Sequence, residues 1–186
     1  ETLDIWDLQL VKYGTEVMKR RVGFVQELNE IIGGLHEKLS GGTEKLTIEY
    51  QPCVEETAFL DTVTKMRERD LRMKSTCFGP HKDDLIFFIN GSEVKKYGSQ
   101  GQQRTAALSL KLAEIELVKK VVKDTPVLLL DDVLSELDSS RQNQLLDAIQ
   151  DIQTMITCTG LEDFVNHRFH IDKIFKVEEG KVTSQN

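Results

Sequence analysis

The sequence has few of the features that mark secreted and membrane proteins. Its three cysteines, Cys53, Cys77 and Cys158, are odd in number and far apart, which excludes a disulfide-stapled secreted scaffold. No apolar run approaches the roughly 20 residues that a membrane-spanning helix requires. The chain also shows no basic and apolar leader for export. We therefore expect a protein of the reducing cytoplasm, with no membrane partner.

Basic residues are in the minority. The 186 residues include 24 Lys and Arg against 31 Asp and Glu, a net charge of −7, so the chain as a whole does not attract nucleic acid. Any affinity for DNA must come from a local basic patch or from two associated copies. The composition is otherwise that of a globular protein with one sizeable core or two small ones. Because the first residue is Glu1 rather than Met, we expect a piece of a longer polypeptide.

Residues 1–78 have the pattern of a helical arm domain. Apolar residues recur at steps of three and four over residues 6–39, which predicts one long helix that ends at Ser40, Gly41 and Gly42. The stripe consists of Trp6, Leu10, Tyr13, Val17, Phe24, Leu28, Ile31 and Leu35. The arm is predicted to continue with a strand over residues 47–51 and a charged helix over residues 55–73.

Residues 79–186 have a different pattern, in which helices alternate with apolar, β-branched strands. Such alternation predicts an α/β unit with a mainly parallel sheet and helices. The predicted elements are a strand over 85–89, a turn at Asn90 and Gly91 with a return strand over 93–97, a helix over 102–122, a strand over 126–131, a helix over 139–151, a strand over 154–159 and a hairpin at Glu179 and Gly180.

Two adjacent carboxylates, Asp131 and Asp132, end the apolar strand of residues 126–131. The carboxyl ends of strands are where open α/β sheets bind ligands. This is the arrangement of a Walker B motif, in which the first acid holds Mg²⁺ and the second polarises the attacking water. The alternative interpretation is that both acids merely cap the following turn.

Two further turns precede helices. Ser99, Gln100, Gly101 and Gln102 form a small, glycine-containing turn before the helix of residues 102–122, where backbone N–H groups and the helix dipole favour a phosphate. Ser135 and Asp138 lie in a second turn, just after the acid pair. Read alone, each turn is also explained as a helix N-cap.

The order of these motifs resembles the second half of an ABC-type ATPase head, in which a signature motif, a Walker B motif and a D-loop follow one another. Three segments resemble the RecF family of bacterial recombination mediators more closely. They are Tyr97-Gly98-Ser99-Gln100-Gly101-Gln102-Gln103-Arg104-Thr105, Leu129-Leu130-Asp131-Asp132-Val133-Leu134-Ser135-Glu136-Leu137-Asp138, and Gly79-Pro80-His81-Lys82-Asp83-Asp84-Leu85. A transporter head has LSGGQ where this chain has GSQGQ, and glutamate where it has Asp132.

The resemblance implies an ABC-type C-terminal head lobe over residues 79–186 and ATP sandwiched between two heads of a homodimer. Ser99, Gln100, Gly101 and Gln102 would contact the partner's nucleotide, and Ser135 and Asp138 would line the dimer seam. Asp131 would hold Mg²⁺, and Asp132 would be the general base. Because no G-x-x-x-x-G-K-[ST] sequence occurs, we expect this chain alone to be inactive. The resemblance implies that its full-length parent is a slow, DNA-stimulated ATPase.

The resemblance also implies a role in DNA repair, replication restart, recombination and the SOS response to DNA damage. The partners would be single- and double-stranded DNA and their junctions, together with RecR, and RecO nearby. Two alternatives stay open. In the first, the chain is the head of another chromosome-maintenance or repair ATPase. In the second, it is a non-catalytic interaction module.

One basic segment stands out in this acidic chain. Residues 57–82 contain six basic residues against three acidic ones. The candidates for DNA contact are Lys65, Arg67, Arg69, Arg72 and Lys74. A solvated helix face explains the same residues, and the interleaved acids favour that interpretation.

Three other features have no assigned mechanism. The segment from Gly79 to Leu85 joins the arm to the head. At the position where many ABC heads have a switch histidine, this chain has Cys158 and Thr159, and we expect a hydroxyl at Thr157 or Thr159 to contact the γ-phosphate or a water. His167 and His170 have no companion ligands and are expected to be surface residues.

Overall fold

The computed structural model describes residues 2–159 and 171–185. Its contacts divide the chain into two units, the first ending at Pro126 and the second beginning at Val127. The boundary predicted between residues 78 and 79 falls inside the first unit, because strands on either side of it pair with each other. As a division into functional domains it stays a prediction. No helix among the described residues is long and apolar enough to cross a membrane.

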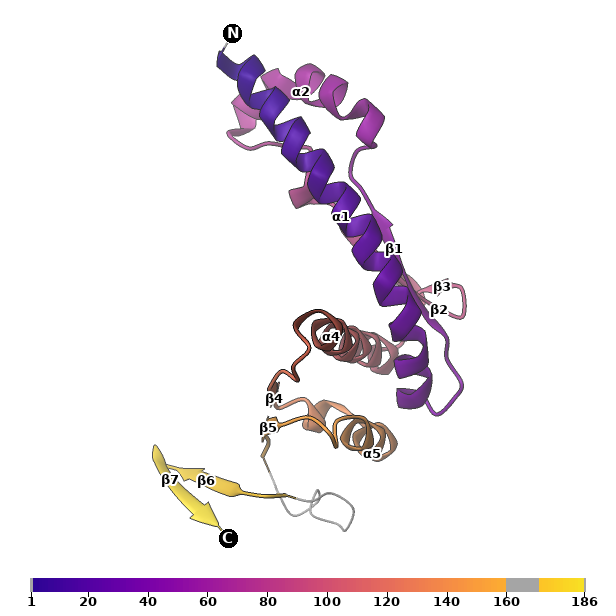
Figure 1. Ribbon diagram of the computed structural model, residues 1–186, viewed down its shortest axis with the longest axis vertical. Helices are drawn as coiled ribbons and strands as arrows, with labels where there is room; N and C mark the ends of the chain where they lie inside the picture. Colours follow the sequence, from indigo (N-terminus) through magenta and orange to yellow (C-terminus); the bar gives the residue numbers. More distant parts are fainter. Residues whose placement is uncertain (1, 160–170, 186) are drawn as a thin grey trace. The chain divides into compact units, whose positions relative to one another are not determined.

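The first unit is built on one long helix, α1 (Thr2–Leu39). At 1.5 Å per residue its 38 residues extend about 57 Å. Along its N-terminal half lies α2 (Phe59–Met73), and along its C-terminal half lie β1 (Leu46–Gln51) and α4 (Gln100–Val122) (Figure 1). One helix therefore serves as the common wall of two hydrophobic clusters.

The buried stripe of α1 only partly matches the predicted one. Leu28 is fully buried, and Ile31 and Leu35 pack against the core, but Trp6 is 62% exposed. Tyr13, Val17 and Phe24 are exposed as well. The residues that α1 buries are Gly14, Met18, Val25, Leu28, Ile32, His36 and Leu39. Leu10 packs against the second cluster as predicted, but the prediction was wrong for Trp6, Tyr13, Val17 and Phe24, because it followed the largest apolar side chains, whereas the contact with α2 is made over Gly14 and Met18.

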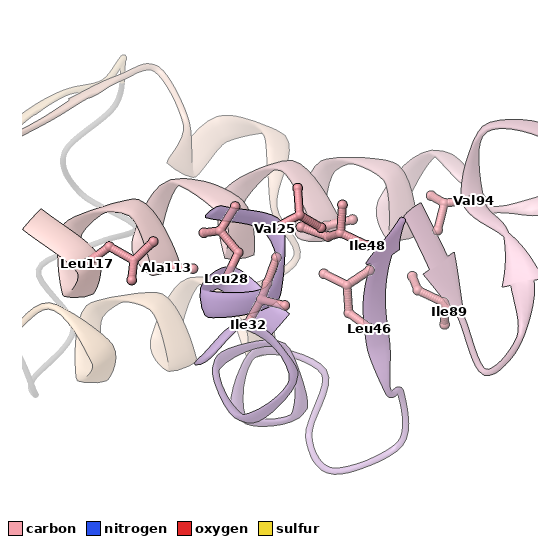
Figure 2. Close-up of a cluster of buried hydrophobic side chains, with 10 residues drawn as sticks. Val25, Leu28, Ile32, Leu46, Ile48, Ile89, Val94, Ala113 and Leu117 are labelled. Atoms are coloured by element: carbon pink, nitrogen blue, oxygen red, sulfur yellow. The ribbon is translucent and has the colours of Figure 1, made fainter. Parts of the chain in front are cut away.

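The core of the first unit lies between α1, a three-stranded antiparallel sheet and α4. The sheet has the order β1, β2 (Asp84–Ile89), β3 (Ser92–Glu93), with Leu46 opposite Ile89 and Gln51 opposite Asp84. Figure 2 shows its side chains, which come from α1, both longer strands, the helical turn at Val94 and α4. They are Val25, Leu28, Ile32, Leu46, Ile48, Ile89, Val94, Ala106, Ala113 and Leu117. Two alanines on α4 allow this helix a close approach to the rest of the core.

The edge of β1 that faces α1 is closed by a side chain. The amide of Asn29 donates to the carbonyl of Ile48 at 2.7 Å and accepts from the N–H of Ile48 at 2.9 Å. An exposed strand edge would leave these backbone groups unpaired. Asn29 therefore fixes the helix to the strand in one register.

The hairpin predicted at Asn90 and Gly91 is confirmed, and both residues have positive φ, 50° and 80°. The return strand predicted over residues 93–97 was wrong beyond Glu93. Residues Val94–Tyr97 form a single helical turn, α3, instead. This turn places Val94 in the core, which an extended strand continuing toward solvent would not do.

A second hydrophobic cluster holds α2 against α1, with Phe59 and Val63 from α2 and Met18 from α1. Gly14 is required at this crossing, because a Cβ there would lie 2.6 Å from the Phe59 ring. The predicted helix over 55–73 begins at Phe59, and the residues before it, Glu56–Ala58, form a 3₁₀ turn.

The segment from Gly79 to Leu85 is explained by the buried carboxylate of Asp83. Arg21 of α1 donates to it at 3.0 Å, and the backbone N–H of Cys53 donates to it at 2.9 Å. The Tyr50 hydroxyl donates to the same carboxylate. Gly79 has a backbone φ of 139°, a value that residues with a side chain rarely adopt. Pro80 then begins a 3₁₀ turn, η2 (Pro80–Lys82). The segment thus ties α1, β1 and β2 together.

The pKa values of this cluster follow from its geometry. Burial opposes ionisation of Asp83, but the hydrogen bonds from Tyr50, Cys53 and Arg21 outweigh it, so the pKa of Asp83 is lowered. Burial, together with the neighbouring Asp83 carboxylate, raises the pKa of Tyr50 to about 12. Burial also raises the pKa of Cys53. The cluster therefore favours an ionised Asp83 and a neutral Tyr50.

The second unit contains the only parallel strand pair among the described residues. In it, β4 (Leu128–Asp131) pairs with β5 (Thr154–Thr157), and Leu128 lies opposite Thr154. Between them lie a 3₁₀ turn, η3 (Leu134–Glu136), and α5 (Ser139–Ala148). The predicted closing hairpin is confirmed as β6 (Ile174–Glu178) and β7 (Lys181–Gln185). The α/β class is confirmed.

We predict that the Tyr50 hydroxyl makes stability fall at alkaline pH. A group whose pKa is raised on folding stabilises the fold below its unfolded value, near 10, and that contribution is lost as pH rises toward about 12. Chemical denaturation of wild type and Tyr50→Phe between pH 8 and pH 12 should show a steeper loss for wild type. Cys53 remains in both proteins, so its own titration cancels. Equal slopes would contradict the cluster described above.

Candidate functional site

The signature turn, residues Ser99 to Gln102, begins α4 in the first unit. The Ser99 side chain accepts from the backbone N–H of Gln102 at 3.2 Å, and the Gln102 side chain accepts from the N–H of Ser99 at 2.9 Å. This reciprocal pair is a capping box. The N-cap interpretation is therefore correct as a local description, and it leaves Ser99 and Gln100 exposed at the positive end of a 23-residue helix.

Gln102 is held from two sides. Its carbonyl oxygen accepts from Ser99, and its amide nitrogen donates to Glu44 Oε1 at 2.9 Å. Glu44 in turn contacts His36, which is fully buried in α1. Sequence reasoning missed both residues, since their contacts join segments far apart in the chain. The one available signal was spacing, because His36 falls four residues after the buried Ile32.

In the second unit, Asp131 and Asp132 end β4, as predicted, and both are exposed. Thr157 lies opposite Asp131 in the parallel pair, and its hydroxyl donates to the Asp131 carboxylate. The N–H of Asp132 donates to the Thr157 carbonyl and hydroxyl oxygens, both at 3.1 Å. The parallel register thus uses Thr157 to hold the acid pair, and its single hydroxyl proton is committed to Asp131.

Asp132 adopts a left-handed backbone conformation, with φ 53°. Among residues with side chains, Asp and Asn tolerate this region best. Its carbonyl accepts from the Ser135 hydroxyl at 2.8 Å. The strand therefore turns sharply after Asp131, and Ser135 closes the turn while remaining exposed.

The predicted D-loop is a compact turn anchored at both ends. Leu134 and Leu137 are buried, and the Gln142 amide donates to their carbonyls at 2.8 and 3.0 Å. Asp138 caps α5, accepting from the backbone N–H of Arg141 at 3.0 Å and from its guanidinium at 2.8 Å. The backbone hydrogen bond, assisted by the guanidinium, lowers the pKa of Asp138. The cap interpretation of Asp138 thus describes its local contacts, and its place at a dimer seam stays a prediction.

Among the described residues, no group of three or more His, Cys, Asp or Glu side chains is arranged to hold a metal ion. Asp131 nevertheless fits the needs of Mg²⁺ in a nucleotide site, where one or two carboxylates act together with phosphate oxygens and water. Its carboxylate is exposed and is oriented by Thr157. A single exposed carboxylate fits a cation whose remaining ligands come from a nucleotide and water.

The switch-position residues Cys158 and Thr159 follow β5 directly, and Cys158 is a free, half-buried cysteine. Their contact with a γ-phosphate or a water stays a prediction. His167 and His170 lie outside the described residues.

The basic residues of α2 differ in their surroundings. Arg67 is bound to two carboxylates of α1, Asp4 at 2.7 Å and Asp7 through both its Nε and its terminal nitrogen. Lys65, Arg69, Arg72 and Lys74 are exposed. Lys74 follows the last helical residue as the C-cap, in a left-handed conformation with φ 50°. A nucleic-acid contact on this helix would therefore depend on four residues rather than five.

Comparison with known proteins gives one consistent relationship. The chain is 60% identical over 186 residues to the DNA replication and repair protein RecF of Lachnospira eligens, covering all of this chain and 51% of that protein. It is 45% identical over 191 residues to RecF of Halalkalibacterium halodurans, covering 97% of this chain and 52% of that protein. The chain thus spans about half the length of the curated relatives it matches. No known family profile matches it.

Solved structures agree. A structure of the recombination mediator protein RecF with ATP, in the RecFOR pathway, aligns with all of this chain and 51% of that one, at a TM-score of 0.79 and 33% identity. An SMC ATPase structure, from work on ATP-driven dimerization and DNA-stimulated activation, aligns with 92% of this chain at a TM-score of 0.53 and 17% identity, a likeness in fold alone. The predicted ABC-type ATPase C-terminal lobe is confirmed.

We predict that Asp138→Ala lowers the free energy of unfolding by about 1 kcal/mol, as expected for removal of an N-cap. Because the folded pKa of Asp138 is lowered, this contribution is present above the ordinary carboxyl value and is lost as pH falls below it. Asp138→Asn is the matched control and should keep most of the stability at neutral pH. Denaturant unfolding at pH 7 measures both, and equal stability of the alanine variant and wild type would contradict the cap.

Proposed function

Since the chain belongs to the RecF family and spans about half the length of its curated relatives, we propose that it supplies the signature turn, the Walker B strand and the D-loop of an ATP-dependent recombination mediator. The proposal is supported by the identity to RecF sequences over the whole chain. It is supported independently by the exposed turn at Ser99 and the exposed acid pair at Asp131 and Asp132. The likeness to other chromosome-maintenance ATPases is one of fold, so we favour RecF over them.

In the proposed arrangement two heads enclose ATP, and each head contributes different groups to one nucleotide. Ser99, Gln100, Gly101 and Gln102 contact the nucleotide held by the partner head, where the N–H groups of a helix start favour phosphate. Asp131 would hold Mg²⁺, which would supply positive charge to neutralise the phosphates. Asp132 accepts a proton from the attacking water. Ser135 and Asp138 line the seam between the heads.

Dimerisation follows from where the binding groups lie. A phosphate-binding loop of the G-x-x-x-x-G-K-[ST] type is absent from residues 1–186, so this chain supplies only the surface that caps a nucleotide. A nucleotide that contacts two heads stabilises the dimer by its differential affinity for the two states. Hydrolysis removes the γ-phosphate contact and returns the heads to monomers. We expect slow turnover, since the switch position has Cys158 and Thr159 rather than histidine.

The biological setting proposed for the full-length protein is DNA repair, replication restart, recombination and the SOS response in the cytoplasm. DNA, single- or double-stranded or at a junction, binds the ATP-closed dimer, and RecR, with RecO nearby, links it to recombinase loading. For DNA contact we propose the exposed residues of α2. The chain's net charge of −7 requires such a local patch.

We predict that Asp132→Asn, in a full-length RecF that contains this segment, reduces ATP turnover by about 10²- to 10⁴-fold, the usual contribution of a general base. Asparagine tolerates the left-handed backbone at this position, so the fold and ATP-dependent dimerisation should be retained. Steady-state hydrolysis and sedimentation velocity measure the two effects. Asp151→Asn, an exposed acid of the same unit, is the control. Unchanged turnover in the Asp132 variant would remove the catalytic assignment.

We predict that replacing the four exposed basic residues of α2 and its C-cap by glutamine weakens DNA binding by full-length RecF. It should also flatten the salt dependence of binding, by up to about 0.9 in log–log slope for each phosphate that is no longer neutralised. The substituted residues are Lys65, Arg69, Arg72 and Lys74. Fluorescence anisotropy with short duplexes at several salt concentrations measures both quantities.

The matched control for this experiment removes the same charge from other exposed lysines of the first unit. They are Lys12 and Lys38 of α1 with Lys111 and Lys120 of α4. If both quadruple variants show the same decrease in affinity, the effect is one of net charge, and α2 is not the contact surface.

A further inference from the structure

The last turn of α1 is connected to the signature turn by a continuous chain of hydrogen bonds. His36 Nε2 lies 3.0 Å from Glu44 Oε2, and Glu44 Oε1 accepts from the Gln102 amide at 2.9 Å. Glu44 belongs to the loop between α1 and β1, and its side chain is 13% exposed. A carboxylate in this position links α1 to α4, two helices that are separated by 60 residues in the chain.

The buried end of this chain is fully satisfied. The Ser109 hydroxyl has one proton, which it donates to the carbonyl of Thr105 at 2.8 Å. His36 Nδ1, 2.9 Å from the same hydroxyl oxygen, is therefore the donor of that contact. His36 and Ser109 are both 0% exposed, so neither has water as an alternative partner. Because an ionised Glu44 carboxylate only accepts hydrogen bonds, His36 Nε2 donates to it, so both ring nitrogens are donors and the contact pairs an imidazolium with a carboxylate. This geometry fixes the imidazole ring, and the ring in turn fixes Glu44.

Glu44 decides which way the Gln102 amide faces. An ionised carboxylate only accepts hydrogen bonds, so the NH₂ group of Gln102 must point toward Glu44. The amide oxygen is then directed at the N–H of Ser99, the contact that completes the capping box. The orientation of Glu44 is thereby passed to the backbone of Ser99, a residue proposed to contact the partner's nucleotide.

The loop that contains Glu44 is itself held in place. Ser40 Oγ accepts from the N–H of Glu44 at 3.3 Å, and Thr43 Oγ1 donates to the carbonyl of Ser40 at 2.8 Å. Asn90, in the β2–β3 turn, accepts from the N–H of Lys45 at 2.9 Å. Glu44 thus extends from a fixed backbone rather than from a free loop.

We propose that Glu44, oriented by His36, is a positioning residue for the signature turn: it couples the C-terminal end of α1 to the geometry in which Ser99 meets a partner's nucleotide. The inference rests on the proposed function, because it concerns the same turn. It adds a residue outside the three motif segments and a route by which a displacement of the long arm helix changes ATP-dependent dimerisation.

The test compares Glu44→Ala with Glu44→Gln in full-length RecF that contains this segment. Alanine removes both acceptors, and we expect ATP-dependent dimerisation to weaken by about tenfold, as when a charge-assisted hydrogen bond is removed. Glutamine can accept from Gln102 through its oxygen and donate through its NH₂ group to Nε2 of a neutral His36 that keeps its Nδ1 proton, so we expect near wild-type dimerisation. Sedimentation velocity over an ATP titration measures dimerisation. Binding of a fluorescent ATP analogue to dilute monomer should be unchanged in both variants, which a general disruption of the fold would not allow.

Two outcomes overturn the inference: wild-type dimerisation by Glu44→Ala, or an equal decrease in the glutamine variant. If Glu44→Ala does not fold, Ser109→Ala, which removes the partner of His36 Nδ1, replaces it, and wild-type dimerisation by that variant likewise overturns the inference. A Ser99→Arg variant blocks the signature turn directly. It therefore shows whether a negative result counts against the role of Glu44 alone or against the proposed function as well. If wild type does not dimerise with ATP, or Ser99→Arg dimerises like wild type, the proposed function itself fails.

Discussion

The packing of α1 against β1 and α4 is the constraint on which the first unit depends. A single helix provides one wall for two clusters, one around Phe59 and one around Leu28 and Ile32. Its edge contact through Asn29 fixes the register of β1, and β1 fixes β2 by antiparallel pairing. Since α4 packs on the same helix, the start of α4, where the signature turn lies, inherits its position from α1.

Polar side chains make that position specific. Apolar packing is tolerant of small displacements, whereas a buried hydrogen bond is broken when its partners move apart. Asp83 gathers Arg21, Tyr50 and the backbone of Cys53 at the junction between the arm and the sheet. His36 and Glu44 do the same at the C-terminal end of α1. Both clusters use residues of α1 to fix segments that arrive later in the chain.

The second unit achieves its arrangement by strand register. Parallel pairing puts Thr157 beside Asp131, so the Thr157 hydroxyl orients the Asp131 carboxylate while the Thr157 oxygens accept from the backbone N–H of Asp132. The left-handed turn at Asp132 and the anchored turn at Leu134 and Leu137 then lead directly into the cap of α5. The acid pair, Ser135 and Asp138 are exposed, as the proposed site between two heads requires.

Sequence reasoning succeeded where the signal is local. The Asn90-Gly91 turn, the acid pair ending a strand, and the caps at Ser99 and Asp138 depend on residues within a few positions of one another, and the structure contains each of them. The motif order was sufficient to indicate the family. Sequence reasoning failed for the return strand at Val94, because the burial of Val94 in the core outweighed its strand propensity.

Apart from the turn at Val94, the sequence by itself determined the main elements, their order and the motif residues, because periodicity, turn chemistry and capping act over short distances. Only the tertiary structure decided which face of α1 is buried, since α2 packs over Gly14 and Met18 and leaves Trp6 and Tyr13 exposed. It alone also showed that Arg67 is occupied by Asp4 and Asp7, that Asp83 is a buried anchor, and that His36 and Glu44 hold the signature turn. The contacts of His36 alone join residues 8 and 73 positions apart, and such separations leave no pattern in a single sequence.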